Sequence, residues 1–192
     1  MQAENWMTNF AKIISSGSYL PEKILTNKDL ESMVDTSDQW ITERTGIKER
    51  RVSSKEETSV DMAFHASKDA LSKSSINKED IGAIFLATCT PERKFPSTAV
   101  LLQNKLDIKN AFSVDVNAAC TGFIYALDIA KKYIESGQIN YALVVGTEKI
   151  TSLLDWTDRN TCVLFGDGAG AMIVGSSKLP GIMSSTIGSD GS

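Results

Sequence analysis

Cys120 is the residue whose type and position best suit a catalytic nucleophile. It lies in a run of small residues at 118–122, between an alternating, strand-like run at 112–117 and a helical pattern that begins at Thr121. The first turn of a helix presents unpaired backbone N–H groups and the positive end of the helix dipole, and both favour the nucleophilic thiolate. The alternative role is a small buried hydrophobe, because free cysteine is among the most buried residue types. Position alone does not decide between the two roles.

The other two cysteines carry a weaker signal for chemistry. Cys89 follows one apolar run and Cys162 lies within another, so we expect both to pack in the interior. Three widely spaced cysteines fit neither a disulfide framework nor a zinc site, and we expect no metal. Free thiols are most simply explained by a reducing, cytoplasmic setting.

Trp40 and Arg44 form a second candidate site. They are four residues apart in a predicted short helix, so they lie on one face of it. A planar indole beside a guanidinium could stack on a nucleotide and hold it. The alternative is a half-buried tryptophan covered by a flexible arginine, and these two residues by themselves favour that alternative.

Two further features, a glycine motif and a histidine, could suggest a function, but their sequence context argues against it. Gly166, Gly168 and Ala171 match the spacing of the dinucleotide fingerprint, but a strand-like run follows them where the fingerprint requires a helix. A tight turn between two strands explains these glycines better, so we expect no nicotinamide cofactor. His65, the only histidine, is far from Cys120 in sequence. A surface or packing role in a predicted helix is favoured for it over a role as a base.

Strands and helices must alternate along the chain to position these residues. Apolar runs predict strands, and capping residues followed by apolar periodicity predict helices. The predicted strands cover residues 11–15, 47–52, 81–88, 112–117, 141–146, 162–165, 169–174 and 181–187, and the predicted helices start near Thr26, Ser37, Thr58, Ser97 and Thr121. This alternation indicates a layered α/β fold with helices packed on a mostly parallel or mixed sheet.

Composition argues against two classes of function. The 192 residues are 42% hydrophobic and carry a net charge of −4, and their few clustered basic residues, at 48–51, are interrupted by Glu49. Nucleic-acid binding would require a basic patch. The apolar runs are shorter than the roughly 18 residues of a membrane span, and the N-terminus does not have the pattern of a signal peptide. Met7 is an alternative start site, which makes residues 1–10 a candidate extension.

Five segments together resemble β-ketoacyl-acyl-carrier-protein synthase III, the family of condensing enzymes that starts fatty-acid synthesis. They are GSYLPEKILTN at 17–27, DTSDQWITERTGIKERR at 35–51, DVNAACTGFIYAL at 115–127, YALVVGTE at 141–148 and TDRNTCVLFGDGAGA at 157–171. Their order and spacing match that family over residues 12–192. The resemblance implies a homodimer with a thiolase-like layered α/β fold of two similar halves. This chain would be one βαβαβ-type half, with a mixed five-stranded sheet covered by helices.

The resemblance also implies roles for individual residues. Cys120, the cysteine of the AACTGF motif, would accept an acyl group from acetyl-CoA or another acyl-CoA, which is a substrate and not a cofactor. The residues expected to hold coenzyme A are Thr36, Trp40, Arg44 and Arg159. The residues expected at the acyl pocket are Phe95, Ile150 and Phe165, and Phe95 would reach across the dimer into the neighbouring pocket.

The family's second half-reaction needs groups that this sequence does not contain. Malonyl-acyl carrier protein would bind, lose carbon dioxide and attack the acyl group, while a histidine and an asparagine stabilise the enolate oxygen. The family carries both in motifs of its second half, and neither motif occurs here. We therefore interpret residues 1–192 as an N-terminal thiolase-like half that requires a C-terminal half for turnover. The alternatives are a condensing enzyme with a branched, medium-chain or secondary-metabolite primer, and a non-catalytic half-domain that acts as an assembly module.

Overall fold

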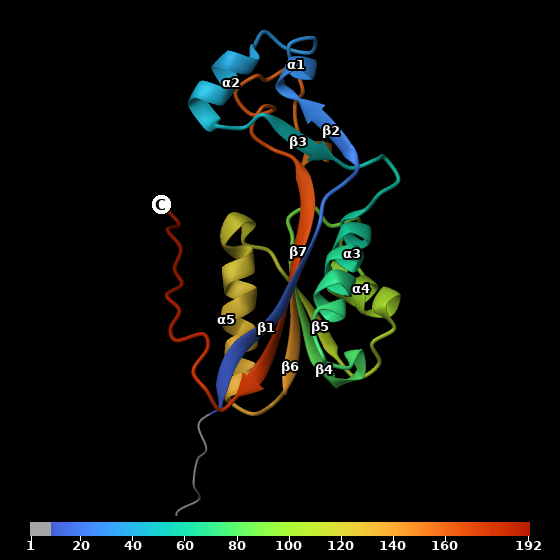
Figure 1. Cartoon of the computed structure of the whole chain (residues 1–192), viewed down its shortest axis with the longest axis vertical. Helices are drawn as coiled ribbons and strands as arrows, with labels where there is room; N and C mark the ends of the chain where they lie inside the picture. The colour runs from blue at the N-terminus through green and yellow to red at the C-terminus, as the bar shows by residue number, and fades with distance from the viewer. Residues whose placement is uncertain (1–8) are drawn as a thin grey trace, which may run out of the picture.

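In residues 9–192, the part of the chain that the computed structural model describes, the main feature is a five-stranded mixed sheet (Figure 1). Its strands lie in the order β1 (Phe10–Tyr19), β7 (Asp167–Ser177), β6 (Tyr141–Lys149), β4 (Ile81–Ala87) and β5 (Phe112–Val116). β4 runs parallel to β5 and β6, whereas β7 runs antiparallel to β6 and β1. The predicted α/β fold with a mixed sheet is confirmed.

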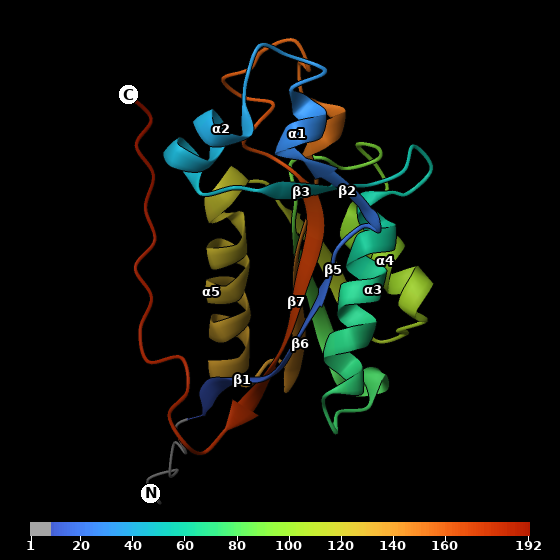
Figure 2. The same ribbon diagram turned by 45° about the horizontal axis from the view of Figure 1, so that its top comes forward.

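Helices cover both faces of this sheet (Figures 1 and 2). α3 (Ser59–Ser72) and α4 (Thr98–Leu106) pack on one face, and α5 (Gly122–Glu135) packs on the other. Because side chains alternate along a strand, β4 directs Ile84 and Leu86 toward α3 and α4, and Ala83 and Phe85 toward α5. Both faces of β4 are therefore buried, which explains its continuous apolar sequence.

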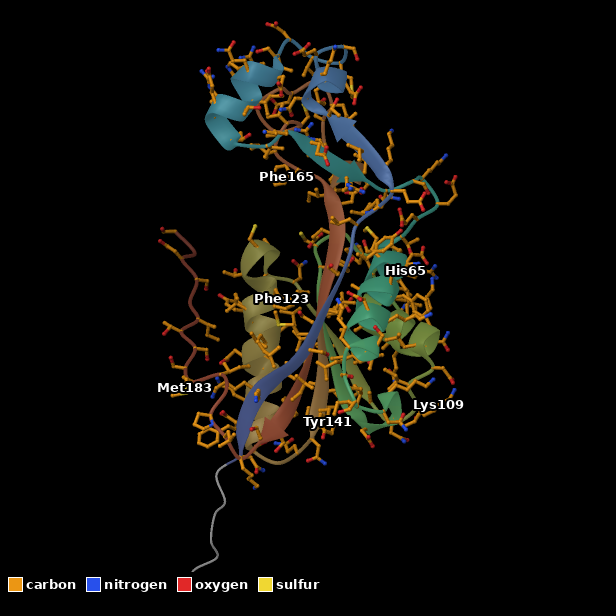
Figure 3. The ribbon with its side chains drawn as sticks, in the orientation of Figure 1. His65, Lys109, Phe123, Tyr141, Phe165 and Met183 are labelled. Atoms are coloured by element: carbon orange, nitrogen blue, oxygen red, sulfur yellow. The ribbon has the colours of Figure 1, made fainter. Side chains whose placement is uncertain are left out.

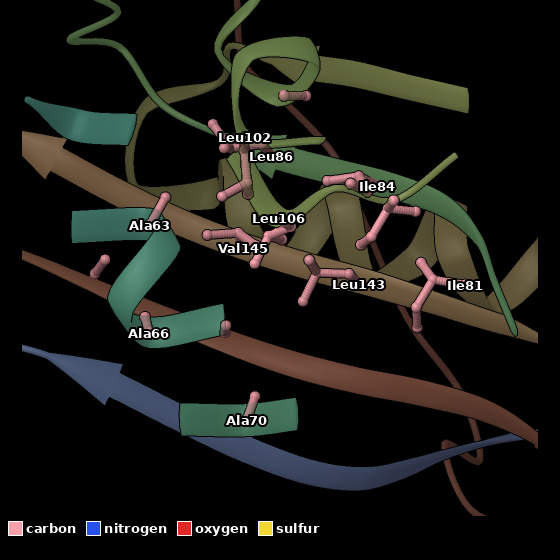
Figure 4. Packing of buried hydrophobic residues seen from close by; sticks show 14 of the residues in the cluster. Ala63, Ala66, Ala70, Ile81, Ile84, Leu86, Leu102, Leu106, Leu143 and Val145 are labelled. Carbon is pink, nitrogen blue, oxygen red and sulfur yellow. The ribbon is translucent and has the colours of Figure 1, made fainter. Parts of the chain in front are cut away.

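α3 lies very close to the sheet. Its inner face carries Ala63, Ala66 and Ala70, whose short side chains meet the larger aliphatic residues of the strands (Figure 4). A Cβ atom placed on Gly17 of β1 would be 2.2 Å from the backbone nitrogen of Ala70. Glycine at this position is what allows the helix and the strand to touch.

A small unit lies beyond one end of the sheet (Figure 1). It contains β2 (Lys23–Thr26), β3 (Glu49–Val52), α1 (Asn27–Leu30) and α2 (Asp38–Thr45), together with the segment 150–166. β2 and β3 pair antiparallel. The buried residues at its centre are Leu25, Leu30, Ile41, Cys162 and Val163. The packing role predicted for Cys162 is consistent with its complete burial there.

Asp167 joins the small unit to the sheet. It is the first residue of β7 and is only 4% exposed. Its Oδ2 atom accepts hydrogen bonds from the backbone N–H and hydroxyl of Ser53, at 2.8 and 2.7 Å, and from the hydroxyl of Thr151, at 2.6 Å. Its Oδ1 atom accepts from the N–H of Thr151 at 2.9 Å. One carboxylate thus fixes three chain segments that pass between the two parts.

Four of the five predicted helix starts are confirmed by their capping geometry, and the fifth helix, α5, follows Thr121 without a side-chain cap. The side chains of Thr26, Ser37, Thr58 and Ser97 each accept a hydrogen bond from the backbone N–H three residues later. For Thr26 and Thr58 the aspartate at that third position reciprocates, which completes a capping box. Gly46, in a left-handed conformation with φ 74°, ends α2.

Two of the predicted strands are wrong. Residues 162–165 form turns, in which the N–H of Cys162 donates to the carbonyl of Asp158 at 3.0 Å. Cys162 and Val163 pack in the core of the small unit and not in a sheet, whereas Leu164 and Phe165 are exposed. Gly166 directly precedes β7 and Gly168 lies within it, so the predicted turn between two strands is also wrong. Residues 181–187 form no strand and run beside α5 (Figures 1 and 2), where Ile182 packs against the core.

The candidate N-terminal extension lies mostly outside the described residues, as does the alternative start at Met7. Phe10, the last residue of that candidate extension, already begins β1. Within residues 9–192, no helix combines the length and the apolar character that crossing a membrane requires.

Candidate functional site

Cys120 occupies the connection between β5 and α5, as the sequence predicts. A single 3-10 turn, Ala119–Thr121, precedes the first residue of α5, Gly122. Ala119 has φ 45°, a left-handed conformation that costs a residue with a Cβ about 1–2 kcal/mol. A strained residue directly before a candidate nucleophile is a feature that clusters at functional sites. The connection leaves the Cys120 side chain exposed and not buried, which argues against the packing role.

A cavity of about 400 Å³ opens beside Cys120. Its walls come from the carboxyl ends of β4 and β6, from the start of β7 and from α5. Besides Cys120, the lining residues are Leu20, Ala87, Ala119, Phe123, Gly146, Thr147, Glu148, Gly168, Ala169 and Gly170. The lining is mostly apolar, and Glu148 is its ionisable carboxylate. Such a space suits a short acyl chain attached to the thiol.

Glycines shape this cavity. A Cβ atom on Gly146 would lie 3.1 Å from the ring of Phe123, so glycine there accommodates the aromatic side chain from α5. A Cβ atom on Gly170 would meet nothing within 4 Å, because this position faces open space. The width of the cavity therefore depends on the absence of a side chain at Gly170.

Glu148 is held by the loop that follows β4. Its Oε1 atom accepts hydrogen bonds from the backbone N–H of Cys89 at 2.8 Å and from the Cys89 thiol at 3.2 Å. Its Oε2 atom accepts from the hydroxyl of Thr90 at 2.6 Å. Burial raises the pKa of the Cys89 thiol, and the hydrogen bond to Glu148 raises it further. The site thus contains two thiols in different environments.

A second cluster surrounds Trp40 in the small unit. The guanidinium carbons of Arg44 and Arg159 each lie 4.5 Å from the centre of the indole. Arg159 also donates to the carbonyl of Asp35 at 2.7 Å and pairs with its carboxylate at 3.5 Å. The buried hydroxyl of Thr36 has no hydrogen-bond partner. The fold thus brings Arg159 to Trp40 across more than a hundred residues of sequence, and an indole with two cations suits a base bearing phosphates.

The three predicted acyl-pocket residues lie outside the lining of the Cys120 cavity. Phe95 is 83% exposed in the loop before α4. Ile150 begins the turn after β6, and Phe165 is partly exposed where the small unit joins β7 (Figure 3). Their roles at the acyl pocket stay predictions.

His65 does not line the Cys120 cavity. It is exposed on α3, whereas Phe123 of the cavity belongs to α5 on the opposite face of the sheet (Figure 3). Its ring stacks on that of Tyr19 at 4.7 Å, and the Tyr19 hydroxyl donates to Glu57 at 2.6 Å. Sequence reasoning missed Glu148, Phe123 and Leu20. Glu148 carried one signal, because it lies near the carboxyl end of a buried parallel strand, where sites gather in α/β folds.

The chain is similar in sequence to known proteins of one family. The family model described as 3-oxoacyl-[acyl-carrier-protein (ACP)] synthase III matches residues 114–191. The β-ketoacyl-[acyl-carrier-protein] synthase III of Ehrlichia chaffeensis is 52% identical over 181 residues, which are 93% of this chain and 57% of that protein.

Solved structures agree with this similarity. The crystal structure of 3-oxoacyl-[acyl-carrier-protein] synthase III from Aquifex aeolicus matches with a TM-score of 0.85 and 56% identity, over 87% of this chain and 54% of that one. The priming β-ketosynthase of the R1128 polyketide pathway matches with a TM-score of 0.88 and 38% identity, over 90% of this chain and 52% of that one. The chain spans about half the length of these relatives. Over that length, the chain is similar to β-ketoacyl-[acyl-carrier-protein] synthase III proteins.

Proposed function

We propose that this chain provides the acyl-accepting part of a condensing enzyme that initiates fatty-acid synthesis, with Cys120 as the nucleophile. The observation that carries the proposal is the position of Cys120, exposed on a strained turn before α5 and beside a mostly apolar cavity. The pair of arginines around Trp40 supports acyl-CoA as the donor.

Acyl transfer follows from this arrangement. The Cys120 thiolate attacks the carbonyl carbon of acetyl-CoA or another short acyl-CoA, the bond to the sulfur of coenzyme A breaks, and coenzyme A leaves as its thiolate. Backbone N–H groups at the start of α5 stabilise the negative charge on the attacking sulfur. Trp40, Arg44, Arg159 and Thr36 hold the nucleotide end of the donor, so that the thioester reaches Cys120.

The condensation that follows requires groups from outside this chain. Malonyl-acyl carrier protein loses carbon dioxide, its carbanion attacks the acyl carbonyl, and Cys120 departs to leave 3-oxoacyl-carrier protein. The developing enolate needs hydrogen-bond donors, and the only histidine of the sequence, His65, does not line the Cys120 cavity. In our proposal a C-terminal half supplies a histidine and an asparagine.

The proposal includes a homodimer. β5 is an edge strand, so its outer backbone groups are available for pairing. Phe112 and Val114 on this strand are 39% and 43% exposed, which is high for apolar residues of a sheet. A second copy placed along β5 would cover them, and the exposed Phe95 could then reach the neighbouring subunit.

Mapping the acyl adduct tests the proposed nucleophile. The chain, together with its C-terminal half, is incubated with acetyl-CoA, and the adduct is mapped by peptide mass spectrometry. The adduct should form on Cys120, persist in Cys162→Ala and vanish in Cys120→Ala. An adduct that stays on another thiol of Cys120→Ala at an unchanged level would show that Cys120 is not the nucleophile.

Two other readouts separate the alternatives. Condensation by the isolated chain would contradict the need for a second half, and it would also contradict the role of a purely non-catalytic assembly module.

The structural match to a priming ketosynthase of a polyketide pathway favours a different primer as the second candidate. Competition among acetyl-, isobutyryl- and octanoyl-CoA for acylation decides between these primers.

A further inference from the structure

Two thiols lie at one end of the sheet, and only one of them can be the acyl acceptor. Cys120 and Glu148 line the same cavity. Cys89 lies two residues after Ala87, which also lines that cavity, and its thiol is only partly buried. A reactive acyl thioester at this cavity therefore lies near a second potential nucleophile.

The Cys89 thiol is committed to a hydrogen bond. Its sulfur is 3.2 Å from Oε1 of Glu148, and the same oxygen accepts the N–H of Cys89 at 2.8 Å. Loss of the thiol proton would place a thiolate against a carboxylate at this distance, which is unfavourable in a partly buried site. None of the ion pairs among residues 9–192 involves Glu148, so no cation of these residues pairs directly with its carboxylate.

The other oxygen of Glu148 keeps the carboxylate in place. Oε2 accepts from the Thr90 hydroxyl at 2.6 Å, and the Thr90 oxygen in turn accepts the backbone N–H of Lys149 at 2.8 Å. Both carboxylate oxygens thus bind the loop after β4, and the carboxylate cannot turn away from Cys89 without breaking these bonds. The ionisable groups that act on the Cys89 thiol are Glu148 from β6 and Cys120 from the turn before α5.

We infer that Glu148 is a positioning residue that directs acyl transfer to Cys120, by holding Cys89 as a hydrogen-bonded, protonated thiol. The thiolate is the nucleophilic form of cysteine, so a thiol kept protonated competes poorly for the thioester. The inference rests on the proposed function, since it assigns selectivity to that site. It also explains why a carboxylate lies in a mostly apolar cavity.

Alkylation by iodoacetamide tests the inference without acyl-CoA. Cys120→Ala is used as the background, so that Cys89 is the accessible thiol and Cys162 stays buried. The rate of Cys89 alkylation is followed by peptide mass spectrometry from pH 6.5 to 10, with and without Glu148→Gln. Removing the charge should raise the rate about tenfold at neutral pH and move the midpoint of the profile to lower pH.

The shape of the pH profile distinguishes charge from packing. A loop that was only loosened would react faster at every pH with its midpoint unchanged, and that result would overturn the inference. A slower reaction in Glu148→Gln would also overturn it, because Glu148 would then activate Cys89. Glu57→Gln is the matched control, because Glu57 also accepts a hydrogen bond from an ionisable hydroxyl, that of Tyr19. This substitution should leave the rate and pH profile of Cys89 alkylation unchanged.

Acyl mapping then connects the result to function. In the otherwise unmodified chain with its C-terminal half, Glu148→Gln should divert part of the acetyl group from Cys120 to Cys89. An acetyl group that stays wholly on Cys120, despite a faster alkylation of Cys89, would overturn the selectivity role. Absence of any acetyl adduct in the parent chain would instead contradict the proposed function and leave the alkylation result to decide on the hydrogen bond.

Discussion

Replacing Asp167 by asparagine should loosen the small unit from the sheet. The carboxylate accepts four hydrogen bonds from Ser53 and Thr151 and is almost fully buried. An asparagine oxygen in the place of Oδ2 would keep three of these bonds, but its NH₂ group would then face the N–H of Thr151. One buried backbone donor loses its partner, which costs about 1–3 kcal/mol.

The alanine variant should cost more. Asp167→Ala leaves the backbone N–H groups of both Ser53 and Thr151 without partners, so we expect a loss of roughly 4 kcal/mol in the free energy of unfolding. Asp155→Asn is the matched control. The Asp155 carboxylate accepts hydrogen bonds from the N–H and hydroxyl of Thr157 at 2.9 and 2.7 Å, but it is exposed. Water can therefore take the place of a lost acceptor, and the free energy of unfolding should fall by under about 0.5 kcal/mol.

Urea unfolding measures these differences. Trp40 and Trp156 both pack in the small unit, so in a Trp6→Phe background tryptophan fluorescence reports on that unit, whereas far-ultraviolet circular dichroism reports mainly on the helices around the sheet. In Asp167→Asn the fluorescence transition should move to lower urea than the circular-dichroism transition. If Asp167→Asn unfolded at the same urea concentration as Asp155→Asn by both probes, this carboxylate would not hold the two parts together.

Three further predictions concern the sheet, the nucleotide site and pH. Gly17→Ala should cost more than about 2 kcal/mol in urea unfolding because its Cβ would clash with α3, whereas Gly170→Ala, which meets open space, should change stability by under about 0.5 kcal/mol; equal effects would contradict the close contact. Trp40→Ala should weaken coenzyme A binding about tenfold in calorimetric titration through loss of stacking, and Trp40→Phe should weaken it less. The hydrogen bond to Glu57 raises the pKa of Tyr19 to about 12, with smaller contributions from burial and nearby carboxylates. Since the folded pKa exceeds the unfolded value of about 10, this contribution to stability is complete below pH 10 and is lost as pH rises toward 12, so the parent chain should lose more stability over that range than Tyr19→Phe.

Local sequence determined much of the fold. Thr58 and Asp61 are three residues apart, and their capping box forms between neighbours whatever the rest of the chain does. The continuous apolar run of β4 likewise predicts a strand buried on both faces, because a run of apolar residues without alternation is typical of such strands. The apolar residues at 162–165 predict a strand wrongly, because a short apolar run does not by itself distinguish a strand from a turn. Here its first two residues, Cys162 and Val163, pack in the core of the small unit and the other two are exposed.

The site shows the same division. The small residues around Cys120 and the helical pattern after them were enough to predict a cysteine at a strand-to-helix turn, because that arrangement involves adjacent residues. The strain at Ala119 and the exposure of the thiol required the structure. The structure was also required to show that Arg159 lies against Trp40, that Glu148 accepts a hydrogen bond from Cys89, and that Asp167 accepts hydrogen bonds from Ser53 and Thr151. These contacts join residues distant in sequence, and only the pairing of strands and the packing of the small unit bring them within hydrogen-bonding or stacking distance.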